Sequence, residues 1–422
     1  MKQYPTYKES GVQWIGLIPE HWEAYPIKWY LQLCKGNKPA ELVESGEEPY
    51  VTMDYIRNRE NKVCMYPANT DGLVHIEDND ILILWDGANA GEVVLGRKGY
   101  LSSTMALCSF DNKVANKEYG YYFLKSLEPI FKQYAGGTTI PHFDSSVLFE
   151  YNYPLPSLSE QQTIAQFLDS KTAKIDESVL LYEQQKADLV EYRKALVSDT
   201  VTRGLNPNVP LKDSGIQWLG QIPEGWKVLK CGLLFSTIGS GTTPKSDNPA
   251  YYSEVGQPWL QTGDLNDGYI TRTNKFVSEL ALNDYSLPIY PKGSIVIAMY
   301  GATIGKLGIL DIETCTNQAC CVLANGNGIE NKFAFYVLAA GKKELINSAN
   351  GGGQPNISQA IIRDFRVPVP SLAEQQQIVA FLDAKTAMID ETICRIDEQI
   401  TDLRNYRTAL ITDAVTGKID VR

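Results

Sequence analysis

The chain has 422 residues, which is too long for one hydrophobic core of usual size and predicts two or three domains. Its 44% hydrophobic and 21% charged residues are typical of a soluble globular protein, and no apolar run approaches the roughly 18 residues that span a bilayer. The formal net charge of −11 excludes a generally basic nucleic-acid-binding protein, so a DNA ligand would need a local positive patch or a partner that supplies the charge.

The N-terminal segment MKQYPTYKESG has no apolar signal core, which predicts a cytoplasmic location. The eight cysteines are irregularly spaced and form no C-x-x-C pair, so we expect reduced, mostly buried thiols. The three histidines, His21, His75 and His142, are not paired at the spacing of zinc ligands. Neither a metal site nor histidine-based catalysis is therefore predicted.

Two segments of the chain occur twice in the same order. SGVQWIGLIPEHW (Ser10–Trp22) returns as SGIQWLGQIPEGW (Ser214–Trp226), identical at nine of thirteen positions. PSLSEQQTIAQFLDSKTAKIDE (Pro156–Glu177) returns as PSLAEQQQIVAFLDAKTAMIDE (Pro370–Glu391), identical at sixteen of twenty-two. Near-identical frames around divergent middles indicate a duplication in which the frames do the same mechanical work and the middles face different targets.

The regions between these frames predict two α+β domains. Apolar runs interrupted by a Gly-rich turn, DILILWDGANAGEVVLG from Asp80 and GSIVIAMYGATIGKLGIL from Gly293, are typical of hairpins. KEYGYYFLKSLEPIFKQY and NKFAFYVLAAGKKELIN have helical character. The separation of the two copies grows from 204 to 214 residues, which places about ten extra residues of the second copy between Trp226 and Gly301.

A long helix is predicted after each middle region. Ser157 and Ser371 are candidate N-caps, and each is followed three residues later by a glutamate, which is the pattern of a capping box. Gly204 and Gly417 are the natural ends of the two helices. Each helix would therefore contain roughly 45 residues, far more than the usual ~11–12.

Apolar residues spaced alternately by four and three along both helices predict that these helices pack on each other as an antiparallel coiled coil. That arrangement would place the two variable domains at opposite ends. The expected packing residues are Ile175, Val179, Tyr182, Leu189 and Leu196 in the first helix and Ile389, Ile393, Ile396, Ile400, Leu403 and Leu410 in the second. From Ile389 to Leu410 such a helix spans about 33 Å, close to one turn of B-DNA. A coiled coil that only holds the domains together remains an alternative.

Several phrases resemble catalytic motifs but lack an essential residue. GSGTTPKS has Pro244 where the second glycine of a phosphate-binding loop belongs, and GATIGKLG lacks the hydroxyl residue that binds magnesium. DNPAYY has Ala250 in place of a proline of the amino-methyltransferase loop and is not preceded by an apolar strand. The carboxylates form no recognisable pair, so we expect no catalytic residue in this chain.

Polar residues flanked by glycines in the variable domains are instead suited to contacts with phosphates and base edges. The candidate DNA-binding residues are Asn37, Lys38, Thr138, Thr139 and His142 in the first domain and Thr242, Thr243, Lys245, Gln354 and Asn356 in the second. The alternative for each residue is a solvated turn without a ligand.

The paired IPE-x-W segments, the P-S-L-x-EQQ-x-I-x-x-FLD-x-KT frames and the phrases GSGTTPKSDNPAYY and GATIGK together resemble the specificity subunit of type I restriction-modification systems, over essentially the whole chain. The resemblance implies two target recognition domains, each reading one half of a split, asymmetric double-stranded DNA target, and helices that set the gap. It also implies that two modification (methyltransferase) subunits dock on the helices and that restriction (motor-nuclease) subunits join them. S-adenosylmethionine, ATP and magnesium would be bound by those partners, and this chain would bind no cofactor.

The resemblance implies four parts in an internal pseudo-twofold repeat. Target recognition domains would occupy residues 1–156 and 207–370, and conserved spacer helices residues 157–206 and 371–422. The sequence departs from this symmetry where GTTP of the second domain has no clear counterpart near residues 36–40, so the first recognition loop cannot be mapped from the second. The alternative functions are a duplicated coiled-coil scaffold that binds proteins without recognising DNA, and a related system that methylates without restricting.

Overall fold

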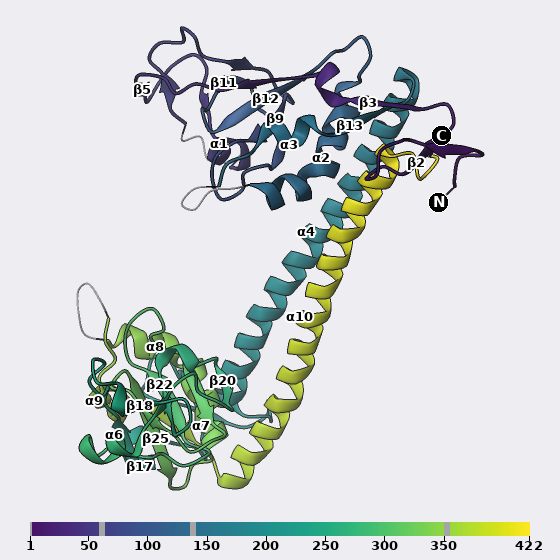
Figure 1. Cartoon of the computed structure of the whole chain (residues 1–422). Helices are drawn as coiled ribbons and strands as arrows, with labels where there is room; N and C mark the ends of the chain where they lie inside the picture. The colour runs from purple at the N-terminus through teal and green to yellow at the C-terminus, as the bar shows by residue number, and fades with distance from the viewer. Residues whose placement is uncertain (1, 59–63, 136–140, 350–354) are drawn as a thin grey trace. The chain divides into compact units, whose positions relative to one another are not determined.

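The computed structural model describes residues 2–58, 64–135, 141–349 and 355–422 (Figure 1). The chain forms two units: unit 1 comprises residues 1–183 and 397–422, and unit 2 comprises residues 184–396. The long helices α4 (Leu158–Arg203) and α10 (Leu372–Val415) contribute residues to both units and confirm the two predicted helices. None of the helices in the described part of the chain is long and apolar enough to cross a membrane.

Unit 1 combines short, mostly antiparallel sheets with helices. Its largest sheet has the strand order β10-β9-β12-β4, and a smaller one has the order β6-β11-β8. The pairs β1-β2, β3-β13 and β5-β7 are separate. The strands are β1 (Tyr7–Glu9), β2 (Leu17–Pro19), β3 (Glu23–Pro26), β4 (Leu31–Lys35), β5 (Leu42–Val43), β6 (Tyr50–Val51), β7 (Tyr66–Pro67), β8 (His75–Ile76), β9 (Ile81–Leu84), β10 (Val93–Leu95), β11 (Gly99–Leu101), β12 (Met105–Phe110) and β13 (Asn152–Leu155). The shorter helices are a 3-10 turn (Ile27–Trp29), α1 (Met53–Arg57), α2 (Lys117–Tyr134) and α3 (Ser145–Phe149).

Unit 2 repeats this architecture with additions. Its sheets have the orders β17-β25-β22-β23-β20 and β18-β21-β19-β24, and the pairs β14-β15 and β16-β26 are separate. The strands are β14 (Leu211–Asp213), β15 (Gln221–Pro223), β16 (Lys227–Lys230), β17 (Phe235–Ser240), β18 (Tyr252–Ser253), β19 (Gln257–Leu260), β20 (Gly268–Ile270), β21 (Phe276–Val277), β22 (Ile295–Ala298), β23 (Leu307–Leu310), β24 (Cys315–Thr316), β25 (Cys320–Gly326) and β26 (Arg366–Val369). The shorter helices are α5 (Cys231–Leu234), α6 (Glu279–Asp284), α7 (Asn331–Ala340), α8 (Lys342–Asn347), α9 (Gln359–Asp364) and 3-10 turns at Pro249–Tyr251 and Thr262–Asp264.

The largest sheets of the two units are equivalent. The order β10-β9-β12-β4 of unit 1 corresponds to β23-β22-β25-β17 of unit 2, where β20 is added parallel to β23 at the edge. The distance in sequence between equivalent residues of the two units grows along the chain. It is 205 positions at the ends of β4 and β17, 209 in β6 and β19, and 214 in β9 and β22. Nearly all of the extra residues of the second copy therefore lie in the connections on either side of β19, within the predicted interval.

The starts of the long helices confirm the predicted serine caps. The backbone N–H of Glu160 donates to Ser157 Oγ at 3.3 Å, and Glu374 N–H donates to Ser371 Oγ at the same distance. The two glutamates do not complete the capping box as predicted. Glu160 is buried and accepts a hydrogen bond from the Tyr4 hydroxyl at 2.9 Å, whereas Glu374 accepts one from the Trp226 indole at 3.1 Å. His21 of the first IPE-x-W segment also contacts Glu160, with Nε2 3.0 Å from Oε2, so each carboxylate holds the neighbouring IPE-x-W segment to its helix.

A buried glutamine anchors each α+β domain to the first turn of its helix. Gln161 Nε2 donates to the carbonyls of Val114 and Pro156 at 3.0 and 2.9 Å, and its Oε1 accepts from Asn116 N–H at 2.7 Å. In unit 2, Gln375 makes the equivalent bonds to Gly328, Pro370 and Glu330 at 3.1, 2.9 and 2.7 Å. Both side chains are fully buried, so all of these bonds are shielded from water.

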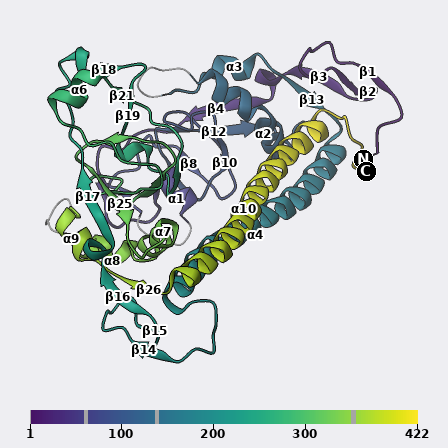
Figure 2. The same ribbon diagram turned by 90° about the horizontal axis from the view of Figure 1, so that it is seen from below.

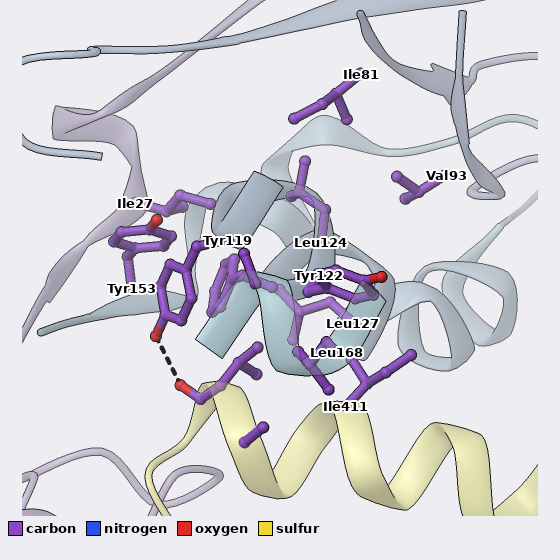
Figure 3. Close-up of a cluster of buried hydrophobic side chains, with 14 of the residues drawn as sticks. Ile27, Ile81, Val93, Tyr119, Tyr122, Leu124, Leu127, Tyr153, Leu168 and Ile411 are labelled. Atoms are coloured by element: carbon purple, nitrogen blue, oxygen red, sulfur yellow. Dashed lines mark hydrogen bonds between the residues drawn. The ribbon is translucent and has the colours of Figure 1, made fainter. Parts of the chain in front are cut away.

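The core of unit 1 joins the α+β domain to both long helices. Helix α2 places Tyr119, Leu124 and Leu127 in a buried cluster with Leu168 of α4 and Ile411 of α10 (Figure 3). The hydroxyl of Tyr119, which is fully buried, donates to the carbonyls of Val415 at 2.9 Å and Pro154 at 3.1 Å. The last turn of α10 is thereby part of the same core as the first copy of the domain. Burying apolar area at about 25 cal/mol per Å² is the main stabilisation of such a cluster.

The predicted apolar stripes are less exposed than the rest of the two long helices. All eleven predicted packing residues are buried or half-buried, while most of their neighbours in the sequence are exposed. Within each unit, the segments of α4 and α10 lie side by side (Figure 1 and Figure 2). Gly204 and Gly417 follow the helix ends with positive φ values of 77° and 73°, which confirms the predicted stops.

The loop that follows β17 requires a glycine because of a close approach. A Cβ added at Gly241 would fall well inside contact distance of the Thr316 carbonyl oxygen. We expect Gly241→Ala to lower the free energy of unfolding by about 1–3 kcal/mol, because backbone on both sides must move. Gly225→Ala, where an added Cβ meets nothing within 4 Å, is the control. Thermal and urea unfolding check both variants, and equal stability of the two would contradict the close approach.

Candidate nucleic-acid interface

In unit 1, three loops that are distant in the sequence meet at one end of the largest sheet. They are the segment 36–40 after β4, the turn 102–104 before β12, and the segment 141–143, and together we call them loop cluster 1. Gly36 N–H donates to the Met105 carbonyl at 2.9 Å. Phe143 N–H donates to the Trp85 carbonyl at 2.7 Å, and an isolated bridge pairs His142 with Asp86. This arrangement brings the predicted residues Asn37, Lys38 and His142 to one region.

Charged side chains form a network at this cluster. Asp86 accepts a hydrogen bond from Lys35 Nζ at 3.1 Å on one oxygen and contacts His142 Nδ1 at 2.6 Å with the other. Lys35 Nζ also lies 5.1 Å from the centre of the Trp85 ring, within the range of a cation–π contact. Partial burial disfavours the charged carboxylate, but the hydrogen bonds from His142 and Lys35 outweigh it and lower the pKa of Asp86.

The remaining predicted residues of the first domain differ in their roles. Asn37 is exposed, but its Nδ2 donates to the Gly72 carbonyl at 2.8 Å and so holds the loop to the neighbouring chain. Lys38 is exposed beside it. Tyr50 links two loops of the cluster, because its hydroxyl donates to the Asn37 carbonyl at 3.3 Å and accepts from Ser103 N–H at 3.1 Å. Thr138 and Thr139 lie outside the residues that the structure describes.

Unit 2 builds an equivalent loop cluster 2 from segments 241–245, 317–319 and 355–357. Gly241 N–H donates to Thr316 Oγ1 at 2.9 Å. Ile357 N–H donates to the Met299 carbonyl at 2.8 Å, and an isolated bridge pairs Asn356 with Tyr300. The contacts of Ile357 and Asn356 repeat those of Phe143 and His142 in unit 1. The two glycines donate to different groups, a carbonyl for Gly36 and a side-chain hydroxyl for Gly241.

The repeated contacts align the loop after β4 with the loop after β17, which the sequence alone did not. At Gly36, an added Cβ would meet the carbonyl oxygens of Leu101 and Ser102, as one at Gly241 would meet that of Thr316. The tetrapeptide GNKP of unit 1 therefore corresponds to GTTP of unit 2, and the proline of each is buried. The sequence concealed this correspondence because only the glycine and the proline, which the close packing requires, are shared.

Loop cluster 2 carries mostly neutral polar side chains and one lysine. Thr243 Oγ1 donates a short hydrogen bond to Gln318 Oε1, and both residues are exposed. Thr242, Lys245 and Asn356 are also exposed. The predicted Gln354 lies outside the described residues.

Three residues at these clusters were missed in the sequence analysis. Lys35 and Asp86 were overlooked because Lys35 ends the strand β4 and Asp86 follows the apolar strand β9 by two residues, and both sequence runs were interpreted as core. The only signal for Asp86 was its position directly before the repeated Gly-Ala pair. Gln318 stands in a turn without a motif, so its partnership with Thr243 emerges only from strand pairing.

A cleft of about 650 Å³ opens beside Thr243. Its lining includes Tyr252, Trp259, Gln261 and Lys275, which combine aromatic surface with hydrogen-bonding groups.

Throughout the described residues, no group of three or more histidine, cysteine or acidic side chains could hold a metal ion. Five of the eight cysteines are buried, and all eight are free thiols. The polar residues of the two loop clusters can bind and discriminate polar ligands by hydrogen bonding.

Comparison with known proteins gives a consistent result for both copies. The family model described as type I restriction modification DNA specificity domain matches residues 19–180 and 223–402. The type I restriction enzyme MjaVIII specificity subunit of Methanocaldococcus jannaschii is 32% identical over 431 residues, which cover 99% of this chain and 97% of that protein.

Solved structures share the fold. One similar chain has a TM-score of 0.74 and 17% identity, and the match covers 95% of this chain and 99% of that one. It comes from a structure described as the structural basis of complex assembly and conformational transition of the type I R-M system. The HsdS subunit from Thermoanaerobacter tengcongensis has a TM-score of 0.53 and 16% identity, covering 95% and 98%.

The ion pairs of Asp86 give loop cluster 1 a defined dependence on pH. Since the pKa of Asp86 is lowered in the folded protein, its contribution to stability is present above the usual value of 3.8 and is lost as the pH falls through the lowered value. We expect Lys35→Ala to raise the titration midpoint of the Asp86 carboxyl carbon in ¹³C NMR spectra. The exposed Lys113 provides the control variant Lys113→Ala. An unchanged midpoint in Lys35→Ala would show that the pair does not act on Asp86.

Proposed function

The chain belongs to the family of type I restriction-modification DNA specificity subunits, and from this premise we propose that it reads a bipartite, asymmetric DNA target, with one half-site for each α+β domain. The observation that carries the proposal is the construction of the same loop cluster twice on the same backbone contacts with different side chains. Lys35 and Asp86 stand beside His142 at loop cluster 1, whereas loop cluster 2 presents Thr243 and Gln318. Different hydrogen-bonding groups favour different bases, which supports two unlike half-sites.

We further propose that α4 and α10 form an antiparallel coiled coil that sets the gap between the half-sites. Burial of the apolar stripes supports it, as do ion pairs between the helices. In unit 1, Arg407 pairs with Asp176 at 2.9 Å and Arg404 with Glu183 at 2.7 Å, so residue numbers run in opposite directions along the two helices. In unit 2, Arg193 pairs with Asp390 at 2.8 Å. Such solvent-exposed pairs are worth only about 0–1 kcal/mol each, so their role is to fix the register while the apolar stripe stabilises the pair.

The outer surface of the two helices supports the docking of methyltransferase subunits. Leu180, Leu181 and Tyr406 in unit 1 expose 66%, 64% and 48% of their surface, and Met388 in unit 2 exposes 61%. Large apolar side chains on the outside of a helix pair are suited to burial against a partner protein. We propose that methylation and cleavage belong to partner subunits, which bind S-adenosylmethionine, ATP and magnesium, and that this chain itself is not catalytic.

Sequencing of methylated bases in the organism that carries this gene, with and without the gene, tests the proposed function. We expect deletion to remove methylation from one bipartite motif with two different half-sites. Duplex binding by the purified complex with its methyltransferase partner provides the second measurement. A complex that binds this motif no better than random DNA, together with an unchanged methylation pattern, would favour a protein-binding scaffold instead.

The gap-setting role of the helices is tested by lengthening both of them. Inserting four residues after Leu189 and four after Ile396 adds just over one turn to each helix and nearly preserves the phase of the stripe. Each helix becomes longer by roughly 6 Å, so we expect the unspecified gap of the methylated motif to grow by nearly two base pairs. The same insertion after Asn208, in the exposed connection after α4, should leave the gap unchanged. An unchanged gap in the double insertion would contradict the proposal.

A further inference from the structure

We infer that Gln318, held in place by Thr243, reads an adenine in the half-site bound by unit 2. This inference rests on the proposed function and assigns one base-reading residue within it. The two copies can be compared inside one molecule, since their loop clusters share a backbone scaffold and differ in the side chains placed on it.

The scaffold accounts for what the two clusters have in common. Gly36 and Gly241 are required by the close approach to a carbonyl oxygen, and the buried prolines three residues later keep the loops packed. Strand β11 pairs with β6 in unit 1 as β24 pairs with β19 in unit 2, so Leu101 is equivalent to Thr316. Two residues further along each chain segment, Gln318 is therefore equivalent to Ser103. The fold therefore accepts a short hydroxyl side chain at this position and does not require a glutamine.

The link between the loops differs between the two units. In unit 1 the Tyr50 hydroxyl joins the loop at Asn37 to the turn at Ser103. The equivalent residue in unit 2 is Trp259, which has no hydroxyl and whose indole N–H is buried without a partner among the described residues. The bond from Thr243 to Gln318 joins the same two loops in unit 2, and it does so with an exposed side-chain amide.

The chemistry of the amide selects the base. Because the Thr243 hydroxyl donates to Gln318 Oε1, the amide is held with its oxygen toward Thr243 and retains a second lone pair on that oxygen. The Nε2 hydrogens have no partner among the residues that the structure describes. One acceptor and one donor side by side match N6 and N7 of adenine in the major groove, whereas guanine presents two acceptors there.

The positions that carry the ionic network in unit 1 favour neutral recognition in unit 2. The charged residues of loop cluster 1 are replaced in unit 2 by uncharged ones. Ser240 stands at the position of Lys35, Tyr300 at that of Asp86 and Asn356 at that of His142. Ser240 Oγ accepts from Gln359 Nε2 at 2.9 Å, so this edge of the cluster is also held by neutral hydrogen bonds. No charge at these positions competes with a bidentate contact from the glutamine.

The test measures base discrimination by the complex of this chain with its methyltransferase partner. Duplexes carry the methylated motif with each position of both half-sites replaced in turn by the other three bases. We expect Gln318→Ala to weaken binding of the unmodified motif by about 5- to 150-fold and to abolish discrimination at a single A·T position. Gln318→Glu should shift the preference at that position toward cytosine, whose N4 amino group donates to a carboxylate.

Two further variants separate reading from folding. Thr243→Val keeps the side-chain shape but removes the hydroxyl that orients the amide, and we expect weaker discrimination at the same position. Gln257→Ala is the matched control, because Gln257 is a glutamine of the same unit whose Nε2 donates to the Glu313 carbonyl at 3.1 Å. We expect this control to leave discrimination at all positions unchanged.

The outcomes distinguish this inference from the proposed function. Unchanged discrimination in Gln318→Ala, or an equal loss of binding to every duplex, would show that Gln318 only ties the two loops, and would overturn the inference while leaving sequence-specific recognition intact. A complex of the unaltered chain that does not discriminate between any of the duplexes would overturn the proposed function itself.

Discussion

The fully buried amides of Gln161 and Gln375 connect each α+β domain to the first turn of a long helix, and the placement of each domain on its helix depends on them. Each amide satisfies two carbonyls and one N–H of the backbone. A buried hydrogen bond contributes only about 0.5–1.5 kcal/mol, but leaving one of these backbone groups unpaired would cost about 1–3 kcal/mol. The domain is therefore held in one orientation on its helix, which any recognition of bases at a fixed spacing requires.

On this rigid attachment, the two domains combine a constant scaffold with variable side chains. Glycines that approach a carbonyl oxygen closely, buried prolines and isolated β-bridges recur in both loop clusters. These features fix the backbone and leave the exposed side chains free to differ. One cluster consequently holds an ionic network around Asp86, and the other holds a neutral pair of Thr243 and Gln318. Because both clusters keep the backbone fixed, a change of the exposed side chains does not require a change of fold.

The glutamates at the helix starts show where local sequence patterns stop being sufficient. Ser157 and Ser371 cap their helices as the S-x-x-E pattern predicts, since a cap depends only on residues within one turn. Glu160 and Glu374 instead bind Tyr4 and Trp226, which are more than a hundred residues away. A buried carboxylate takes the strongest donors that the tertiary structure offers, and those donors cannot be identified from neighbouring residues.

The sequence by itself determined the duplication, the two long helices with their apolar stripes and ends, and the membership of the chain in its family. Those features depend on periodicity and on residues close together in the chain. Only the tertiary structure decided which polar residues meet: it joined Lys35 to Asp86 and His142, paired Thr243 with Gln318, and aligned GNKP with GTTP. The physical reason is that strand pairing brings together residues separated by fifty or more positions, and this pairing cannot be predicted from residues that are neighbours in the sequence.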